Sequence, residues 1–420
     1  MRIHNLIQSF CIGALLLVAR TGFAQSYGIE LHNTLMPASS GMGGTSLSRP
    51  QDSISATNGN PATLTQYHGT NVTFGGAFGD ANFRIRQHDA FPNPPLDPIV
   101  TPYSAKSDYP ATVLPNIGLT QQLEIMGMPM ITGIAFVGDA GAGVDFTDSP
   151  ESGGAAAGLT FLTVVASGAT EVTDNLSVGG SFRFTTGTLD SPFAGVSRNS
   201  LDYGVRGTFG ANYNLGYNTT VGVTYQTKQE FNFNNAVLLN LGNGNFGGPQ
   251  DVSLDLPRNV GFGVANSSLM NGNLLLAVDV IWKNWDDADL FSPIYDDQWV
   301  VQVGSQLTHG RLKYRLGYAY AQNPIQSPPT VGSIGGVTPP GLLAGVEYVQ
   351  AQLAVINEHR LSGGLGIQDF LPGIDVDCSI GKMFGASQDL GSTTVDLSSY
   401  WLTFGVTWHF DGPGRSNSCL

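Results

Sequence analysis

The stretch YWLTFGVTWHF, residues 400–410, alternates large apolar side chains with smaller or polar ones over most of its length. Successive side chains of a β-strand point to opposite faces, so this pattern predicts a strand with one apolar face. A second stretch, LKYRLGYAY at residues 312–320, shows the same alternation. The two stretches set the period with which the rest of the chain can be compared.

Alternation with a period of two recurs in fourteen segments, each uncertain by a few residues at its ends. No stretch after residue 24 holds about 18 consecutive apolar residues, which argues against a membrane protein built from helices. The chain is therefore predicted to be all-β. The segments span residues 70–87, 111–122, 129–139, 158–172, 175–188, 200–214, 218–232, 251–266, 271–285, 297–308, 311–323, 356–369, 373–385 and 396–410.

The connections between these segments alternate in length. Long external loops and short periplasmic turns are typical of outer-membrane barrels, whereas a soluble β-sandwich has no reason to sort its loops in this way. The pattern predicts a 14-stranded antiparallel transmembrane β-barrel with both chain ends on one side. The long connections are 87–111, 139–158, 188–200, 232–251, 285–297, 323–356 and 385–396, and the short ones are 122–129, 172–175, 214–218, 266–271, 308–311 and 369–373.

Aromatic residues gather near the predicted strand ends, where membrane barrels carry an aromatic girdle at each interface. The alternative is that they form the core of a soluble sandwich, which the loop pattern disfavours. These residues are Trp282, Trp285, Trp299, Trp401, Trp408, Tyr314 and Tyr400.

The first 24 residues have the features of an export signal. Arg2 precedes the apolar run FCIGALLLVA at residues 10–19, which is too short to span a bilayer, and Gly22 and Ala24 suit a signal peptidase. Cleavage before Gln25 would leave 16 basic residues against 32 acidic ones, a net charge of −16. Such a chain is not attracted to phosphate backbones, so no nucleic acid partner is expected.

Cofactor and metal signals are absent from the sequence. The His residues lack the spacing of metal ligands. The predicted mature chain has two cysteines, Cys378 and Cys419, which lie far apart in the sequence. We therefore expect no metal site, no cofactor and no disulfide framework.

Residues 39–64, SSGMGGTSLSRPQDSISATNGNPATL, form a compact, turn-rich stretch between the signal and the first strand. Its glycines Gly41, Gly43 and Gly44 allow tight turns, and Asp52 with Ser53 can start a helix. Asn60, Pro61 and Ala62 suit a capped first helical turn with close backbone packing. The predicted organisation is a signal peptide (1–24), an N-terminal hatch inside the barrel (25–69), the barrel (70–410) and a polar C-terminal tail (411–420).

These motifs resemble the N-terminal hatch of the FadL/TodX family, outer-membrane channels for long-chain fatty acids and aromatic hydrocarbons. The GMGG knot, Asp52-Ser53 and Asn60-Pro61-Ala62 carry the resemblance. Later parts of the chain agree with it, namely Leu256-Pro257, Trp285 closing LLLAVDVIWKNW, Trp299 opening WVVQVGSQL, LKYRLGYAYAQNPI at 312–325 and HRLSGGLGI at 359–367.

The resemblance implies a hatch-filled fourteen-stranded barrel in the outer membrane of a Gram-negative bacterium. It implies capture of a hydrophobic small molecule by external loops, passage past the hatch and lateral exit through a gap made by a kinked strand. The expected partners are that ligand, outer-membrane lipid and lipopolysaccharide, and the barrel-assembly machinery during biogenesis. A monomer is expected. The alternatives are a phospholipase-like barrel enzyme, for which the sequence offers no convincing Ser and His pair, and a general porin or adhesin.

Candidate ligand contacts come from two observations. Strand alternation predicts that Arg84, Arg183, Arg206 and Arg315 face the lumen, where one of them could bind a carboxylate. The alternative is that they pair with inward acids or hatch carbonyls and pin the hatch. The resemblance further implies that Tyr27, Ile29 and Leu31 occupy the ligand path and move when ligand arrives. The loops at 87–111, 232–251 and 323–356 are apolar enough for capture, or they pack on each other over the rim.

Overall fold

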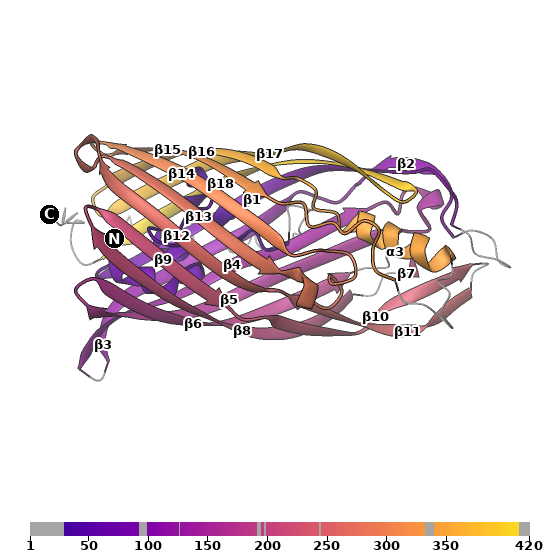
Figure 1. The fold of residues 1–420 in the computed structure, drawn as a ribbon, viewed down its shortest axis with the longest axis horizontal. Coiled ribbons are helices and arrows are strands. Elements are labelled where there is room, and N and C mark those ends of the chain that lie inside the picture. The colour runs from indigo at the N-terminus through magenta and orange to yellow at the C-terminus, as the bar shows by residue number, and fades with distance from the viewer. Residues whose placement is uncertain are drawn as a thin grey trace, which may run out of the picture.

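The computed structural model describes residues 29–91, 99–125, 127–190, 195–196, 199–242, 245–331 and 340–410. Fourteen antiparallel strands run obliquely around a long closed barrel (Figure 1). The first and last strands complete the ring, with Asn71 opposite His409 and Gln87 opposite Thr393. The strands are β1 (Thr70–Gln87), β3 (Thr112–Ile125), β4 (Met128–Asp145), β5 (Ala156–Thr173), β6 (Leu176–Asp190), β8 (Asn199–Gly216), β9 (Thr219–Gln226), β12 (Arg258–Leu269), β13 (Leu274–Asn284), β14 (Gln298–His309), β15 (Leu312–Ala321), β16 (His359–Leu371), β17 (Ile374–Leu390) and β18 (Thr393–His409).

Short turns close one end of the barrel, called here the turn end, and most of the longer connections lie at the other, the loop end. At the loop end β2 (Tyr103–Lys106) pairs with the end of β1. A separate three-stranded sheet is formed there by β7 (Gly195–Val196), β10 (Gln229–Gly242) and β11 (Asn245–Leu256). The helix α3 (Pro340–Gln352) lies at the same end (Figure 1). Short 3₁₀ turns are η4 (Pro150–Ser152), η5 (Met270–Gly272) and η6 (Trp285–Asp287).

The predicted fourteen-stranded barrel is confirmed, with two corrections to its strands. The predicted strands 218–232 and 251–266 each merge two strands, because β9 ends at Gln226 before β10 begins and β11 ends at Leu256 before β12 begins. Pro257 lacks the N–H that a continuous ladder needs, which explains the second break. The alternation continues across both breaks because β10 and β11 also point apolar side chains inward. The predicted loop 232–251 is therefore most of this hairpin.

The predicted loop lengths are confirmed with one exception. The predicted long connection 385–396 is a tight turn, because β17 continues to Leu390 and β18 begins at Thr393. Polar residues such as Ser387 and Asp389 hide these strand ends from a search for apolar alternation. The connection 323–356 contains α3, which the strand period could not reveal.

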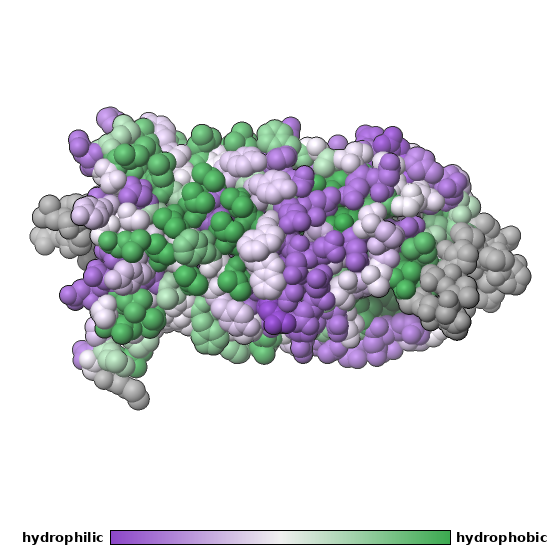
Figure 2. Space-filling view, in the orientation of Figure 1, coloured by the Kyte–Doolittle hydropathy of each residue, from purple (hydrophilic) through white to green (hydrophobic). Residues whose placement is uncertain are grey.

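Apolar side chains cover the outer wall nearer the turn end. Phe182, Phe209, Leu316 and Phe404 are exposed by half or more of their surface. Figure 2 shows apolar residues gathered over one half of the molecule and hydrophilic residues beginning near its middle. Such an apolar belt is the surface that a membrane barrel presents to lipid. Among the described helices, none is long and apolar enough to cross a membrane.

Residues 29–69, called here the N-terminal segment, lie inside the barrel, where most of their side chains are buried. Its four short helices are η1 (His32–Leu35), η2 (Ser39–Met42), α2 (Ser53–Asn58) and η3 (Pro61–Gln66). The Asp52 carboxylate caps α2 by accepting from the Ser55 N–H at 2.6 Å, and its second oxygen accepts from Ala38 and Ser39. The start signal predicted at Asp52 and Ser53 is therefore confirmed.

Inward side chains of the wall bind the segment's backbone and polar groups. Asp279 on β13 accepts from the N–H groups of Ser46 and Leu47 at 2.6 and 2.9 Å. The indole of Trp401 on β18 donates to the Ser40 hydroxyl at 2.8 Å, and the Gly43 N–H donates to Ser362 on β16 at 3.1 Å. Because these partners lie on strands around the ring, the wall fixes the segment from several sides.

Candidate functional site

The loop-end half of the lumen is filled by one large group of apolar side chains, called here the outer cluster. Strand ends contribute Phe83, Ile85, Phe161 and Leu397, all of them buried. Their inward direction follows from strand alternation, but the apolar face here meets the interior and not lipid. The remainder comes from the connections between strands, including Phe146, Phe231, Phe233, Leu254, Leu256, Trp285, Phe291, Ile294, Tyr295, Tyr348, Leu353, Ala354, Val355 and Ile356.

The helix α3 and the residues after it close the outer cluster at the loop end. The Tyr348 hydroxyl lies 2.5 Å from the Tyr103 hydroxyl and 3.1 Å from the carbonyl of Ser152. Burial raises the pKa of Tyr103 to about 12 and raises that of Tyr348 further, so both phenols stay neutral. The Tyr295 hydroxyl donates to the carbonyl of Leu353. These bonds hold apolar residues 353–356 in the interior.

The floor of the outer cluster is a layer of buried charged groups, called here the ionic layer. Glu30, Asp139, Arg183, Arg206 and Lys283 form it, all with less than a tenth of their surface exposed. Arg206 donates to Glu30 at 2.5 Å and lies 3.4 Å from Asp139, which accepts from Arg183 at 2.6 Å. Buried charges are tolerated where they are paired in this way.

Glu30 joins the N-terminal segment to the ionic layer. Its second carboxylate oxygen accepts from Asn259 at 3.0 Å, and its carbonyl accepts from Lys283 at 2.6 Å. Glu30 has a φ of +58° and His32 a φ of +49°, in the left-handed region that few residues other than glycine adopt. Burial and the nearby cation of Lys283 lower the pKa of His32 well below its ordinary value, so its ring is neutral. The wall contacts hold this stretch in a strained conformation.

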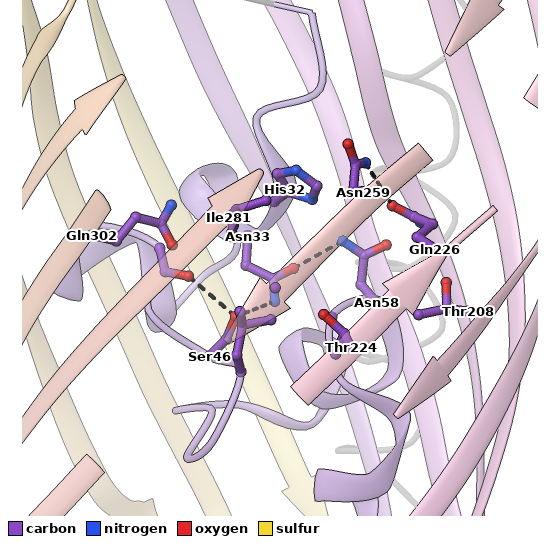
Figure 3. Close-up of a pocket in the computed structure, with 14 residues that line it drawn as sticks. His32, Asn33, Ser46, Asn58, Thr208, Thr224, Gln226, Asn259, Ile281 and Gln302 are labelled. Atoms are coloured by element: carbon purple, nitrogen blue, oxygen red, sulfur yellow. Dashed lines mark hydrogen bonds between the residues drawn. The ribbon is translucent and has the colours of Figure 1, made fainter. Parts of the chain in front are cut away.

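A small polar cavity of about 30 Å³ lies between the N-terminal segment and the wall (Figure 3). Asn33 donates to Ser46 at 2.7 Å beside it, and Asn58 donates to Asn33 at 2.8 Å. The volume suits a water molecule or two and is too small for a hydrocarbon. In the part of the chain that the structure describes, this cavity therefore offers room for water between the segment and the wall, and none for a hydrocarbon.

Three of the four predicted inward arginines point into the lumen. Arg183 and Arg206 belong to the ionic layer, and Arg183 also donates to the Asn58 carbonyl at 2.9 Å. Arg315 donates to Asp377 at 2.6 Å and to Gln306 at 2.7 Å. All three hold carboxylates of the protein itself, which favours the alternative that they pin the interior over the prediction that they bind ligand.

The prediction for Arg84 is wrong. Arg84 and Arg86 face outward and are exposed, whereas their neighbours Phe83 and Ile85 are buried in the outer cluster. The alternation itself is present, but its phase was assigned on the assumption that apolar residues face lipid. At this height the outer wall is hydrophilic, so the apolar face turns inward.

The predicted hatch glycines lie where backbones meet. Gly43 and Gly44 have φ of +72° and +92°. A methyl group on Gly41 would lie 2.9 Å from the Cα of Gly364 on β16. On the wall side, a Cβ on Gly317 of β15 would meet the Gly43 nitrogen at 1.9 Å. Glycine on both surfaces lets the segment approach the wall.

Asn60, Pro61 and Ala62 form the start of η3. The Asn60 side chain accepts from the Ala62 N–H at 3.1 Å, and Pro61 occupies the first turn. Asn60 also donates to the carbonyls of Leu47 at 2.6 Å and Ala211 at 3.1 Å. These contacts are structural. Whether any hatch residue gates a ligand stays a prediction.

Of the predicted N-terminal contacts, Ile29 belongs to the outer cluster and Leu31 packs with Leu35, Met383 and Trp401. Tyr27 lies outside the described residues, as do the signal peptide and the C-terminal tail, so the proposed division of the chain stays a prediction. Sequence reasoning missed Glu30, Asp139 and Lys283. Isolated charges on mainly apolar strands, such as Asp139 on β4 and Lys283 on β13, were the available signal.

The fold defines a class of structure, the closed fourteen-stranded antiparallel β-barrel with an N-terminal segment in its lumen. Among solved structures, the Pseudomonas putida toluene transporter TodX matches 92% of this chain and 100% of its own, with a TM-score of 0.64 at 17% identity. The Ralstonia pickettii toluene transporter TbuX matches 89% and 98%, with a TM-score of 0.59 at 18% identity. A Pseudomonas aeruginosa FadL homologue matches 93% and 100%, with a TM-score of 0.60 at 14% identity.

The resemblance to the FadL/TodX family is thus confirmed at the level of the fold, and two of these neighbours, TodX and TbuX, are toluene transporters. A scan against protein-family models and a search of curated proteins find no match.

Proposed function

We propose that this protein is an outer-membrane channel for passive uptake of hydrophobic molecules, aromatic hydrocarbons or long-chain fatty acids, and is not an enzyme. The observation that carries the proposal is the outer cluster, an apolar interior that reaches the loop end beneath α3 and stops at the ionic layer. A hydrophobic molecule loses about 25 cal/mol for each Å² of apolar surface that water wets. An apolar interior above the membrane therefore offers it a shielded path.

Capture would begin at the loop end, where α3 and residues 353–356 cover the outer cluster. A ligand entering there would replace these side chains, and apolar contact is non-directional, so the exchange costs little free energy. Ile29 lies in the same cluster, directly before Glu30. A ligand that displaces Ile29 would therefore also shift the backbone of the strained residues 30–32 that follow it. Movement of the segment would open the polar half, and we propose lateral exit through the wall.

Fatty acids would need a cation for their carboxylate, and one buried residue can supply it. Arg360 on β16 is buried, and its guanidinium forms no ion pair within 4 Å in the part of the chain that the structure describes. The charge of Lys283 lies close enough to interact with it. Arg183, Arg206 and Arg315 are already paired. If carboxylates are the cargo, Arg360 is the residue we propose for the head group.

Ligand binding to purified protein in detergent tests the proposal. A fluorescent long-chain fatty acid and an aromatic hydrocarbon should each be titrated, because the fold alone does not choose between them. Leu353→Asp, which puts a charge into the outer cluster, should weaken binding more than tenfold, whereas Leu342→Asp on the exposed side of α3 should not. Heat-modifiable migration on a gel shows that each barrel is folded. Absence of saturable binding across both ligand types would refute the assignment.

Arg360→Gln separates the two cargoes. The variant should lose affinity for the fatty acid and keep its affinity for the hydrocarbon, since only the carboxylate needs the guanidinium. Equal binding of both ligands by the variant would remove Arg360 from the fatty acid site.

A further inference from the structure

Four basic side chains face outward on neighbouring strands at the loop end. Arg84 and Arg86 lie on β1, Lys106 on β2 and Lys382 on β17, and all four are exposed. The strands follow one another around the wall in the order β2, β1, β18, β17 (Figure 1). The whole chain has only 18 Lys and Arg against 32 Asp and Glu. A group of four on one face is therefore a local reversal of the protein's charge.

The register places this basic face immediately above the apolar belt. Phe78, Leu402 and Ile380 lie opposite one another on β1, β18 and β17 and are exposed. Two residues further along each strand, the same outward row contains Asp80, Tyr400 and Lys382. Asn82 lies two residues beyond Asp80 on β1, and Arg84 lies two residues beyond Asn82. In the ladder between β1 and β2, Arg84 is directly opposite Lys106. Lys382 therefore lies one row above the apolar residues, and Arg84 and Lys106 lie three rows above them.

A surface groove of about 280 Å³ lies within this face. The ladder between β17 and β18 shifts register between Met383 and Ala386, where a bulge separates the strands locally. Small side chains leave the groove open, and Arg84 stands on its edge. The groove is lined by Asn82, Arg84, Gly385, Ala386, Ser387, Asp396, Leu397 and Ser398.

Most of the cations on this face lack an ion pair in the described residues. Arg86 pairs with Asp396 at 3.0 Å, whereas Arg84, Lys106 and Lys382 have no carboxylate within 4 Å. Two described cations elsewhere in the loop-end half behave differently: Lys228 pairs with Asp255 at 2.9 Å, and Arg258 pairs with Asp287. Asp80, Asp389 and Asp396 are the acids in the same rows, so the four cations leave the face with a net charge of +1.

We propose that this face binds a phosphate-bearing glycolipid of the outer leaflet, with a phosphate in the groove and acyl chains on the belt below. The proposal rests on the outer-membrane location in the proposed function, which sets the belt's upper edge at the head groups. A phosphate oxygen accepts strong charge-assisted bonds from guanidinium and ammonium groups. Arg84 and Lys106 lie opposite one another on adjacent strands about 4.8 Å apart, so both can donate to one phosphate at the edge of the groove, and Lys382 lies nearer the belt. Phe78, Leu402 and Ile380 continue the contact along the acyl chains.

The test compares two variants of the full-length protein purified in mild detergent. The triple variant Arg84→Gln, Lys106→Gln, Lys382→Gln removes the unpaired cations, and the control variant Lys228→Gln, Arg258→Gln removes two paired cations elsewhere. Purified lipopolysaccharide is the probe, and its binding to delipidated protein is measured by titration. The triple variant should bind more than tenfold more weakly than the native protein, and the control within about twofold. Equal binding by the triple variant, or equal loss in the control, would overturn the proposal.

Two further measurements separate this proposal from the proposed function. Hydrocarbon binding is titrated in the same samples and should be unchanged in the triple variant, since its residues lie outside the lumen. A lipopolysaccharide with its phosphates removed should bind native protein as weakly as the triple variant binds the intact lipid; binding that ignores the phosphates would refute the phosphate site. If native protein bound lipopolysaccharide but no hydrocarbon, the channel assignment would fail and the lipid site would stand.

Discussion

The two halves of the lumen are filled in opposite ways. Toward the turn end, the N-terminal segment packs on the wall through small apolar groups and is fixed by many directional contacts, such as those of Asp279 and Trp401 with its backbone and Ser40. Toward the loop end, the outer cluster is held mainly by apolar packing. Hydrogen bonds and ion pairs lose their value when a partner is replaced, whereas apolar contact is non-directional. The molecule thus combines a half that admits no substitute with a half in which a guest can take the place of the protein's own side chains.

Removing the N-terminal segment should have the largest effect on this contrast. Deletion of residues 27–64 leaves a barrel with no filling in its turn-end half, and we expect it to insert into membranes and leak polar solutes. Ion conductance in planar bilayers measures the leak, with the native protein as the sealed control. A deleted protein that stayed closed to ions would show that the wall or the loops form the barrier.

Arg206→Ala should be the most damaging single substitution in the ionic layer. It leaves Glu30 buried without its ion-pair partner, while Asp139 keeps Arg183, and breaking a buried pair on one side costs about 3–5 kcal/mol. The midpoint of denaturant unfolding reports the loss. A second variant, Arg206→Ala with Glu30→Gln, should recover part of it because one stranded charge is removed; a fully additive loss in the double variant would contradict the pairing.

Gly317→Ala tests the close approach of wall and segment. Its new Cβ would lie 1.9 Å from the Gly43 nitrogen, so the segment must shift, and overpacking of this kind costs about 1–3 kcal/mol. Gly310→Ala is not a clean control because Gly310 has a positive φ of +59°. Gly345→Ala is better, since nothing lies near its Cβ position and it sits within α3, where alanine is favoured. Unfolding midpoints should fall for the first variant and not for the second.

The smallest effect is expected in the outer cluster. Ile294→Leu conserves volume, and such exchanges usually cost less than about 1.5 kcal/mol. The unfolding midpoint should therefore change little, while the order of affinities among hydrocarbons of different shape can shift because the lining has changed. A loss as large as that of Arg206→Ala would show that the outer cluster is as specific as the polar half.

The wall could be predicted from the sequence because each strand carries its own period. Which of a strand's two faces points into the lumen could not be predicted with one rule for all strands. Phe182 and Phe184 face lipid and send Arg183 inward, whereas Phe83 and Ile85 face the interior and send Arg84 outward. Both stretches place an arginine between two large apolar residues. What differs is the height of the strand relative to the apolar belt, and that height emerges only when all fourteen strands are aligned.

The candidate site was predicted only in part for a related reason. Gly43, Asp52 and Asn60 act through local geometry, which neighbouring residues encode. The partners of Glu30 lie on β8, β12 and β13, and their meeting depends on the register of strands far apart in the chain. Inward charges could be recognised on single strands, but the pairs that they form could not.

The contact between Ser40 and Trp401 joins residues 361 positions apart, and it constrains the order in which parts of the protein fold. The segment that fills the lumen is synthesised first, yet several of its partners belong to the last three strands. Contacts across such separations form late because the chain between them must be ordered beforehand. The segment therefore waits without its partners until the ring closes, and a slow closure would expose it to proteases. Pulse-chase sampling with limited proteolysis should find residues 29–69 cleavable before closure and protected afterwards.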